Sequence, residues 1–564
     1  NFRTQKDIPP IVPRSSTKEC IDFICKDLQT AADYLPARWE SENKNFGRIT
    51  SGAALALKGR VELLYASPLF NRADDVTRWE TAYQTNLAAV KKLEEGNFGL
   101  AYENNSGKNA AGWGKIFSDY IGSEGGGGTV SEAVLVTLYN NVSPAEHLQL
   151  EKWNGWEHSL RPANAGGGGG MTPTAEMVDL FPMADGKKPN DMNGSYDYNQ
   201  ELFFLNRDPR FYRTFAFPGV EWKFDSDDLK SFGEKGQLPY GINGYTTGNN
   251  YKLWNYCWYD NVDDRNSNSK SGYAADCLGT KNTGIYLRKR TDDLALNSNP
   301  LYIFEKTSGN GFRQSAAPYM EIRFAEVLLN YAEAACGANH FDEAVNALKR
   351  IRKRVGYTDN CGLDPAIFND RAKLFEAILY ERQIELAYEG KRFDDLRRWM
   401  LFDGGTGKVE GAPASWTLTG WGGNTCTWLG FAPLNDQRRE NMEFRLNDKY
   451  GIGGTTGDIS SDPLLKAGVE RPAGLDLREE INDEEGNQLT ELQSFYNEHF
   501  IRKLKKGDAY DSSKQPLYIK FLPRYYFLGF SQGALNNNKG IEQCIGWEDS
   551  NNGGAQGTFD PLAE

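Results

Sequence analysis

Residues 318–400 constrain the fold more than any other part of the chain. Apolar residues recur at steps of three and four in residues 322–336, and again in residues 341–351. This period places them on one face of each of two helices. Asn339 lies between the two segments at a position that suits a tight turn, and the small side chain of Ala344 allows the helices to approach closely. The pattern is typical of tetratricopeptide repeats.

A second helical pair is predicted directly after the first. Asp364 and Pro365 are suited to the N-cap and first turn of a third helix, and Gly390 to its end. A short fourth helix is predicted at residues 393–400. The stretch therefore predicts four helices in two antiparallel pairs.

Length and charge limit the classes of protein that fit. The chain has 564 residues, enough for two to four lobes. Its net charge of -13 disfavours binding to nucleic acid or to anionic lipid surfaces. No run of 18 apolar residues occurs, so no transmembrane helix is predicted.

The remaining segments predict a mostly α fold with an irregular, loop-rich lobe. Further helices are expected at residues 16–35, 48–70 and 76–93, and a short capped helix at 172–181. Strands are expected at residues 132–139, 284–289 and 302–306, and a strand pair at 517–529. We therefore expect a tetratricopeptide-like helical scaffold made of residues 1–95 and 317–401. Residues 96–316 and 402–564 are expected to form the ligand-binding lobe, with short strands.

The aromatic content of 13% is high, and two groups of rings are candidate ligand-binding residues. These residues are Tyr245, Tyr251, Trp254, Tyr256, Trp258 and Tyr259 in one group, and Trp421 and Trp428, together with Trp416, in the other. Aromatic faces stack on the apolar faces of sugar rings, while neighbouring amides and carboxylates bind hydroxyl groups. The alternative is that these rings form the core of a lobe with few helices.

Catalytic and metal-binding motifs are scarce. The four histidines have no paired spacing, and residues 529–533 fit GxSxG without a good helix after them. Acidic runs at 225–228 and 260–264 lack the spacing of a calcium loop, and Cys257 and Cys277 could close a loop as a disulfide. An acidic and basic group resembles an active site, but ion pairs that fix a helix crossing are the preferred interpretation. Its members are Glu385, Glu389, Arg392, Asp395 and Arg397. We expect no enzyme, no cofactor and no metal.

Several motifs resemble one family in the same order along the chain. RFAEVLLNYAEA at residues 323–334 and ERQIELAYEGKRFDDLRRW at 381–399 are similar to the SusD/RagB family. PTAEMVDLF at 173–181, RDPRFYRTF at 207–215 and QCIGW at 543–547 resemble further segments of that family. The resemblance implies a surface-exposed outer-membrane lipoprotein of Bacteroidetes, with its lipid anchor outside this chain. It also leads us to expect that the family's N-terminal section is missing here.

The same resemblance implies a function. Members of this family capture nutrients, and we expect an oligosaccharide ligand and a SusC-like TonB-dependent outer-membrane transporter as the partner. The alternatives are a peptide-binding, RagB-like receptor, a helical-repeat scaffold that binds only protein, and a glycan-cleaving enzyme.

Overall fold

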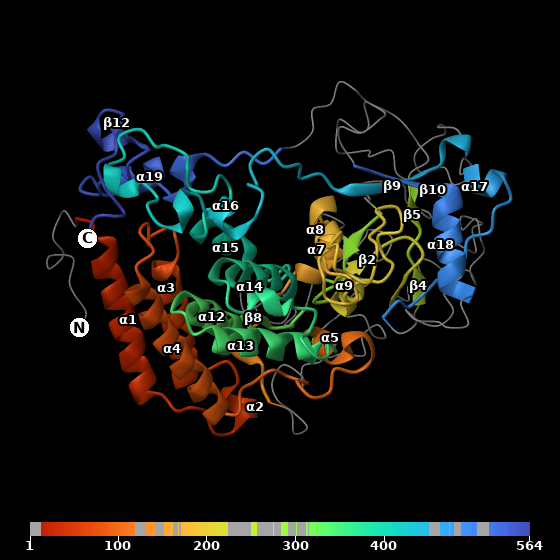
Figure 1. The fold of residues 1–564 in the computed structure, drawn as a ribbon, viewed down its shortest axis with the longest axis horizontal. Coiled ribbons are helices and arrows are strands. Elements are labelled where there is room, and N and C mark those ends of the chain that lie inside the picture. Colours follow the sequence, from red (N-terminus) through yellow and green to blue (C-terminus); the bar gives the residue numbers. More distant parts are fainter. Residues whose placement is uncertain are drawn as a thin grey trace, which may run out of the picture.

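The computed structural model describes most of the chain. The described residues are 13–118, 130–140, 152–161, 167–168, 171–223, 250–256, 274–275, 284–291, 301, 312–313, 315–450, 463–472, 474–478, 487–504 and 518–564. The C-terminus lies at the helical end of the molecule, and most of the short strands lie toward the other end (Figure 1). The predicted mostly α fold is confirmed.

The helical end is made of two chain segments that pack side by side. The first segment contains α1 (Thr17–Tyr34), α2 (Glu42–Asn45), α3 (Ser51–Ala66), α4 (Val76–Glu95) and α5 (Ala111–Ser118). The second contains α12 (Phe324–Gly337), α13 (Phe341–Arg354), α14 (Arg371–Glu385) and α15 (Arg392–Arg398). Helix α12 packs against both α4 and α13, so the two segments form one helical array (Figure 1).

Side-chain caps set where the helices begin. Ser16 and Glu19 form a reciprocal capping box at α1, and the Thr50 and Asp75 side chains cap α3 and α4. Asn339 has a left-handed backbone in the turn between α12 and α13, as predicted. The four predicted helices of residues 318–400 are confirmed as α12 to α15.

Two details of that prediction are wrong. Residues Tyr319–Arg323 form a strand, β8, because they pair in antiparallel fashion with β1 (Ala133–Thr137). Asp364 caps only a 3-10 turn at Pro365–Ile367, and α14 begins later, at Arg371, where Asp370 is the cap.

The strand-containing end is built from short two-stranded ladders around small helices. Its strands are β2 (Phe215–Ala216), β3 (Glu221–Lys223), β4 (Asn250–Lys252), β5 (Asn255–Tyr256), β6 (Ala274–Ala275), β7 (Tyr286–Leu287), β9 (Met442–Leu446) and β10 (Phe500–Leu504). The pairs are β2 with β7, β3 with β4, β5 with β6, and β9 with β10, all antiparallel. Its helices are α7 (Trp156–Leu160), α8 (Ala175–Asp179), α9 (Pro209–Thr214), α17 (Pro463–Lys466) and α18 (Asn487–His499).

The C-terminal segment returns to the helical end, where it forms small elements. These are α16 (Thr425–Leu429), α19 (Gln532–Asn537), and the pair β11 (Glu548–Asp549) and β12 (Ala555–Gln556). Short 3-10 turns lie at Lys108–Ala110, Ala414–Trp416, Trp421–Gly423, Asp448–Tyr450, Pro523–Tyr526 and Ser550–Asn552. The strand pair predicted at residues 517–529 is wrong, because Pro523 starts a 3-10 turn there.

The first hydrophobic core fills the helical array with small aliphatic residues around one aromatic group. Trp79 lies at its centre, with ring centroids of Phe375 at 5.2 Å, Trp421 at 6.0 Å and Trp399 at 6.1 Å. Alanines of α3, α4, α12 and α13 surround this group. Leu418, Trp421 and Leu429 belong to the same core, so the packing crosses the boundary predicted at residue 401.

The second core fills the strand-containing end and is mainly aromatic. Phe203 shows the packing, with centroids of Phe217 at 4.9 Å and of Phe444 at 5.5 Å. Tyr380 and Ile384 of α14 also belong to this core, while Leu374 and Phe375 of the same helix belong to the first. Helix α14 therefore contributes side chains to both cores.

Buried ion pairs join the two ends of the molecule at α14. This group, called the α14 ion cluster below, consists of Glu132, Asp208, Glu381, Glu385 and Glu389 with Arg210, Lys289, Arg323, Arg352 and Arg354. All ten side chains are buried. They come from α9 and its N-cap, β8, α13, α14 and the three loops that contain Glu132, Lys289 and Glu389, so the cluster holds distant segments together.

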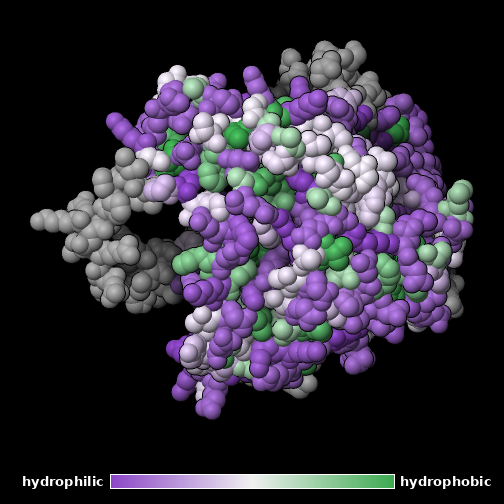
Figure 2. Space-filling view, turned by 60° about the vertical axis from the view of Figure 1, so that its left-hand side comes forward, coloured by the Kyte–Doolittle hydropathy of each residue, from purple (hydrophilic) through white to green (hydrophobic). Residues whose placement is uncertain are grey.

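Among the described residues, no helix is both long and apolar enough to cross a membrane. The visible described surface is mostly hydrophilic, with hydrophobic residues in small separate groups (Figure 2).

Candidate functional site

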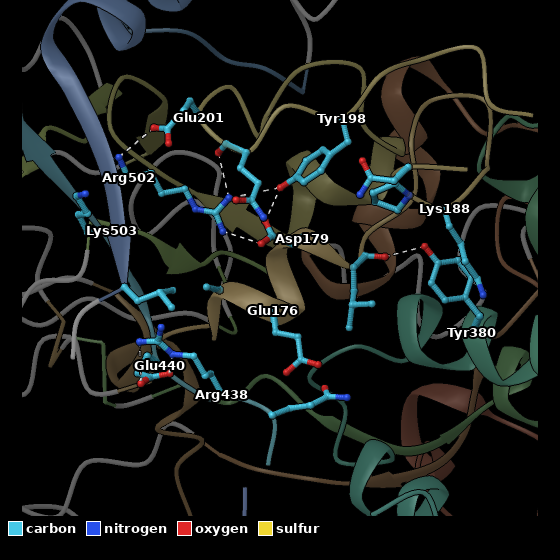
Figure 3. A pocket seen from close by; sticks show the side chains of 17 residues that line it. Glu176, Asp179, Lys188, Tyr198, Glu201, Tyr380, Arg438, Glu440, Arg502 and Lys503 are labelled. Carbon is cyan, nitrogen blue, oxygen red and sulfur yellow. Dashed lines mark hydrogen bonds and ion pairs between the residues drawn. The ribbon is translucent and has the colours of Figure 1, made fainter. Parts of the chain in front are cut away.

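A cavity of about 650 Å³ lies where the strand-containing end meets α14, and we call it the α8–β10 cavity (Figure 3). Its lining comes from α8, the loop before α9, α14, the segment before β9, and β10. The lining residues are Ala175, Glu176, Asp179, Leu180, Lys188, Pro189, Asn190, Tyr198, Gln200, Glu201, Tyr380, Gln437, Arg438, Glu440, Arg502, Lys503 and Leu504. This volume lies within the range typical of small-molecule sites.

Local structure sets the direction of the lining side chains on α8 and β10. The Thr174 hydroxyl accepts the Met177 backbone N–H at 3.3 Å and so starts α8. Glu176 and Asp179 are three residues apart and thus share one face of that helix. Successive residues of a strand point to opposite faces, so Arg502 points toward Asp179 and Lys503 lies on the other side of β10 (Figure 3).

Asp179, Arg502 and Tyr198 form the best-connected polar group of the cavity. Arg502 donates to Asp179 Oδ2 at 2.7 Å, and the Tyr198 hydroxyl donates to Asp179 Oδ1. Arg502 also donates to the Gln200 carbonyl at 3.0 Å, and its backbone N–H donates to Glu201 at 3.1 Å. Burial, together with the Asp179 charge, raises the pKa of Tyr198 to about 12. Tyr198 therefore stays a neutral phenol.

A second ion pair, between Arg438 and Glu440, forms another wall of the α8–β10 cavity. Arg438 contacts both carboxylate oxygens of Glu440, at 3.0 Å from Nε and 3.2 Å from an Nη atom. Glu440 is only 3% exposed, and its backbone carbonyl accepts the Ala175 N–H at 3.0 Å. These contacts fix the start of α8 against the segment that leads into β9.

Tyr380 of α14 forms the wall on the helical side. Its hydroxyl donates to the Leu180 carbonyl at 2.6 Å. The Lys188 ammonium lies 5.1 Å from the centroid of the Tyr380 ring and is paired with Glu376. The ring is thus held in place at both its edge and its face.

Glu176 differs from the other charged groups that face the cavity. Its half-buried carboxylate makes no hydrogen bond or ion pair with any residue that the structure describes. Burial raises the pKa of Glu176, while the positive charge of Arg392 acts in the opposite direction without contact. Burial also lowers the pKa of Arg392, to about 10. Glu176 is therefore available to a ligand.

The predicted aromatic residues of the first group divide between the core and undescribed segments. Trp254 is 2% exposed and packs edge-on against Phe495 at 5.2 Å, and Tyr256 is fully buried against Phe500 at 5.3 Å. Tyr251 pairs through its backbone with Trp222 in β3 and β4. Tyr245, Trp258 and Tyr259 lie outside the described residues. In this structure the rings of Trp254 and Tyr256 therefore fill the second core.

The second predicted group lies in and next to the first core. Trp421 is 2% exposed, and its indole N–H donates to the Asn71 carbonyl at 2.9 Å. Trp428 is half-buried and packs edge-on against Trp421 at 5.2 Å. Trp416 donates to Asp560 at 2.8 Å. The described residues of both aromatic groups are absent from the lining of the α8–β10 cavity.

Glu385, Glu389 and Asp395 of the predicted acidic and basic group form structural ion pairs, whereas Arg392 and Arg397 form none with the residues described. Burial alone would raise the pKa of Glu389, but Arg323 and Lys289 lower it to about 2. Asp395 is likewise buried, and Arg382 and Arg398 lower its pKa to about 2. Arg397 donates instead to the Tyr526 carbonyl at 2.7 Å.

The remaining motifs have structural roles or fall outside the described residues. The Ser531 hydroxyl of the GxSxG match accepts the Ala534 N–H and caps α19. The acidic runs at 225–228 and 260–264, the predicted strand at 302–306, and Cys257 and Cys277 lie in segments that the structure does not describe. Within the described ranges, no group of three or more potential ligands is arranged to hold a metal ion.

A second cavity, of about 430 Å³, lies between α3, α12 and α15. Arg60 contacts Glu326 at 2.8 Å and Glu321 at 3.3 Å, and Lys391 lies within 3.5 Å of both carboxylates. Arg60 and Lys391 are therefore paired with Glu321 and Glu326 at this cavity.

Sequence reasoning did not identify the residues of the α8–β10 cavity as a site. Glu176 and Asp179 lie in the motif at 173–181, which was interpreted only as a capped helix and a family segment. Their spacing of three residues is the one local signal that two carboxylates share a face. Tyr198, Arg438 and Arg502 come from distant segments, and only the fold brings them together.

The chain is similar to one protein family and to several known proteins. A family model described as the SusD family matches residues 114–547. SusD-like protein P2 of Formosa agariphila is 35% identical over 120 residues, which cover 19% of this chain and 23% of that curated relative. The solved structure of BT4246 is 19% identical with a TM-score of 0.56, and the match covers 96% of this chain and 79% of that one. A SusD-like protein of Bacteroides fragilis is 26% identical with a TM-score of 0.47, over 71% and 63% of the two chains.

Proposed function

This chain belongs to the SusD family, and from that premise we propose that it binds a glycan in the α8–β10 cavity. We further propose that it acts at the outer surface of the outer membrane and passes the glycan to a SusC-like TonB-dependent transporter. The resemblance seen in the sequence motifs is confirmed by the family match.

The observation that carries the site proposal is the fixed polar lining of the cavity. Sugar recognition requires hydrogen-bonding groups held in place, together with apolar surface for the C–H faces of the ring. The Asp179–Arg502–Tyr198 group supplies fixed donors and acceptors, and the Tyr198 side chain supplies apolar surface. Because Gln200 also holds Arg502 through its backbone carbonyl, little ordering is required when a ligand binds.

Calorimetry with a glycan panel tests this proposal. The blocking variant is Gln200→Trp, because Gln200 lines the cavity with an exposed side chain and its bulk can be increased without removing an ion pair. Gln84→Trp on α4 is the matched control, since Gln84 is also exposed and lies outside the cavity lining. We expect saturable binding of at least one oligosaccharide, lost in Gln200→Trp and kept in Gln84→Trp, with circular dichroism unchanged in both.

Other outcomes would contradict the proposal in distinct ways. Binding that survives Gln200→Trp would place the ligand elsewhere, for example on Tyr245, Trp258 and Tyr259, which remain predictions. Binding of peptides but of no glycan would favour a RagB-like receptor. A change in ligand mass after incubation would identify a glycan-cleaving enzyme. The transporter is tested separately, by co-purification with the tagged protein from outer membranes.

A further inference from the structure

We infer that the α8–β10 cavity selects uncharged glycans, and that Glu176 accepts a sugar hydroxyl and repels anionic sugars. This inference rests on the proposed glycan-binding function and adds the charge class of the ligand and a residue that determines it.

Three of the four cations that line the cavity are already paired with carboxylates of the protein. Arg502 is paired with Asp179 at 2.7 Å, Arg438 with Glu440 at 3.0 Å, and Lys188 with Glu376. A sulfate or uronate group is bound tightly when it meets a donor of this kind that has no other partner. Here it would have to displace a carboxylate, and the displaced carboxylate of Glu440 would remain buried without a partner.

Lys503 also borders the cavity, but its side chain lies on the side of β10 opposite Arg502 (Figure 3). The alternation of side chains along β10 has the same consequence, because the two residues are consecutive. Lys503 therefore does not supply a cation beside the Asp179–Arg502–Tyr198 group.

Glu176 is the acidic side chain of the cavity left without a partner among the residues described. A carboxylate only accepts hydrogen bonds, and a sugar hydroxyl can donate one to it. The same carboxylate repels an anionic sugar, which is selection by an unfavourable contact with the wrong ligand. Arg392 lies near enough to act on the pKa of Glu176 without touching it. Its positive charge reduces both the attraction of Glu176 for an amine-bearing sugar and its repulsion of an anionic sugar.

The first experiment compares charge forms of one oligosaccharide. Neutral cello-, xylo-, malto-, laminari- and N-acetylchito-oligosaccharides are screened by calorimetry, together with oligogalacturonate and the deacetylated chitosan oligomer. Each neutral ligand that binds is then compared with its own sulfated form. We expect a neutral ligand to bind, and its sulfated form to bind at least about tenfold more weakly.

The second experiment assigns the selectivity to Glu176. Glu176→Gln keeps an acceptor and removes the charge, so we expect neutral affinity to fall by less than about tenfold. The affinity for the neutral ligand divided by the affinity for its sulfated form should become smaller. If the sulfate group weakened binding through its size alone, this ratio would stay unchanged. Glu410→Gln, an exposed carboxylate outside the cavity lining, should leave both affinities as they are.

Three results would overturn the inference. The first is tighter binding of an anionic or amine-bearing oligosaccharide than of its neutral form. The second is an unchanged ratio in a Glu176→Gln protein that melts like the parent. The third is a panel in which only charged oligosaccharides bind. If no oligosaccharide of the panel binds, the proposed glycan-binding function is overturned as well. Failure of the inference alone is thus distinguishable from failure of the proposed function.

Discussion

The two hydrophobic cores of this protein solve the same packing problem with different side chains. The first core places helices in close contact through alanine and glycine, and its tryptophan rings gather around Trp79. The second core has two-residue to five-residue strands and short helices, and phenylalanine, tyrosine and tryptophan rings fill the space between them. Regular helices therefore pack through small side chains, whereas short strands and helices need large side chains to fill the space between them.

Close helix contact in the first core has a clear geometric origin. A Cβ atom placed on Gly337 of α12 would lie 2.2 Å from a ring atom of Trp79, and one on Gly52 of α3 would lie 2.6 Å from Leu93. Both distances are far shorter than van der Waals contact. In the second core edge-on ring contacts take over this role, as between Phe203 and Phe217. The first core therefore depends on small residues and the second on large ones.

Acid should affect both cores at once, because buried carboxylates join them, and this is the largest effect we expect. The pKa values of Glu389 and Asp395 are lowered to about 2 in the folded protein, from ordinary values of 4.5 and 3.8. A carboxyl group with a lowered pKa stabilises the fold above its unfolded pKa, and this contribution disappears as pH falls toward the folded pKa. Denaturant unfolding should therefore lose stability steadily from about pH 4.5 down to about pH 2. A constant unfolding free energy across that window would contradict this.

Removing one charge from the α14 ion cluster, which lies between the two cores, should destabilise the folded protein. Glu385 contacts Arg323 at 2.7 Å and Arg210 at 2.8 Å, and it is also paired with Arg354. Glu385→Gln keeps the shape but removes a negative charge that three buried guanidinium groups share, which costs about 3–5 kcal/mol. Calorimetric unfolding should show a lower transition temperature. Glu94→Gln, which alters a half-exposed pair with Arg350, should change stability by less than about 1 kcal/mol.

A tryptophan truncation sharpens the distinction between a core ring and a ligand platform. Trp254→Ala should cost about 3–5 kcal/mol in urea unfolding, since it leaves a cavity beside Phe495 in the second core. Tyr518→Ala at an exposed site should change stability by less than about 0.5 kcal/mol. If Trp254→Ala left stability intact and abolished glycan binding, the original assignment of Trp254 as a ligand platform would be correct.

A single methyl group tests the close helix packing of the first core and has the smallest expected effect. Gly337→Ala should destabilise the protein by about 1–3 kcal/mol, because the new Cβ would overlap the Trp79 ring. Gly155→Ala is the matched control, since a Cβ there has no atom within 4 Å. Thermal melting of both variants gives the comparison. Equal melting temperatures of the two variants would mean that the rings around Trp79 shift to accommodate the new methyl group without loss of stability.

The difference between the cores also explains which features could be predicted from the sequence. Helices α12 to α15 could be predicted, because alanine, leucine and valine recur with the period of a helix. The rings of Trp254 and Tyr256 follow no such period, so a buried ring and a ligand platform look the same in the sequence. The helical pattern includes Ile322, which belongs to strand β8 instead, because the partner strand β1 lies far away in the chain.

The candidate site was harder to predict for the same physical reason. Asp179 and Arg502 are 323 residues apart, and their ion pair exists only because β10 passes beside α8. No local pattern of the kind that marks a helix reports such a contact. The capped start of α8 could be predicted from Thr174, but the direction in which Glu176 points could not.

The pairing of Asp208 with Arg210 affects how this interior can change during evolution. Both residues belong to the start of α9, and Arg210 donates to both carboxylate oxygens of Asp208, at 3.1 and 2.8 Å. Helix α9 therefore carries its own counter-charge when it packs against Glu381 and Glu385. A mutation of either member alone leaves an unmatched charge, whereas loss of both removes no net charge. The smallest unit that can be exchanged here is thus a pair of residues.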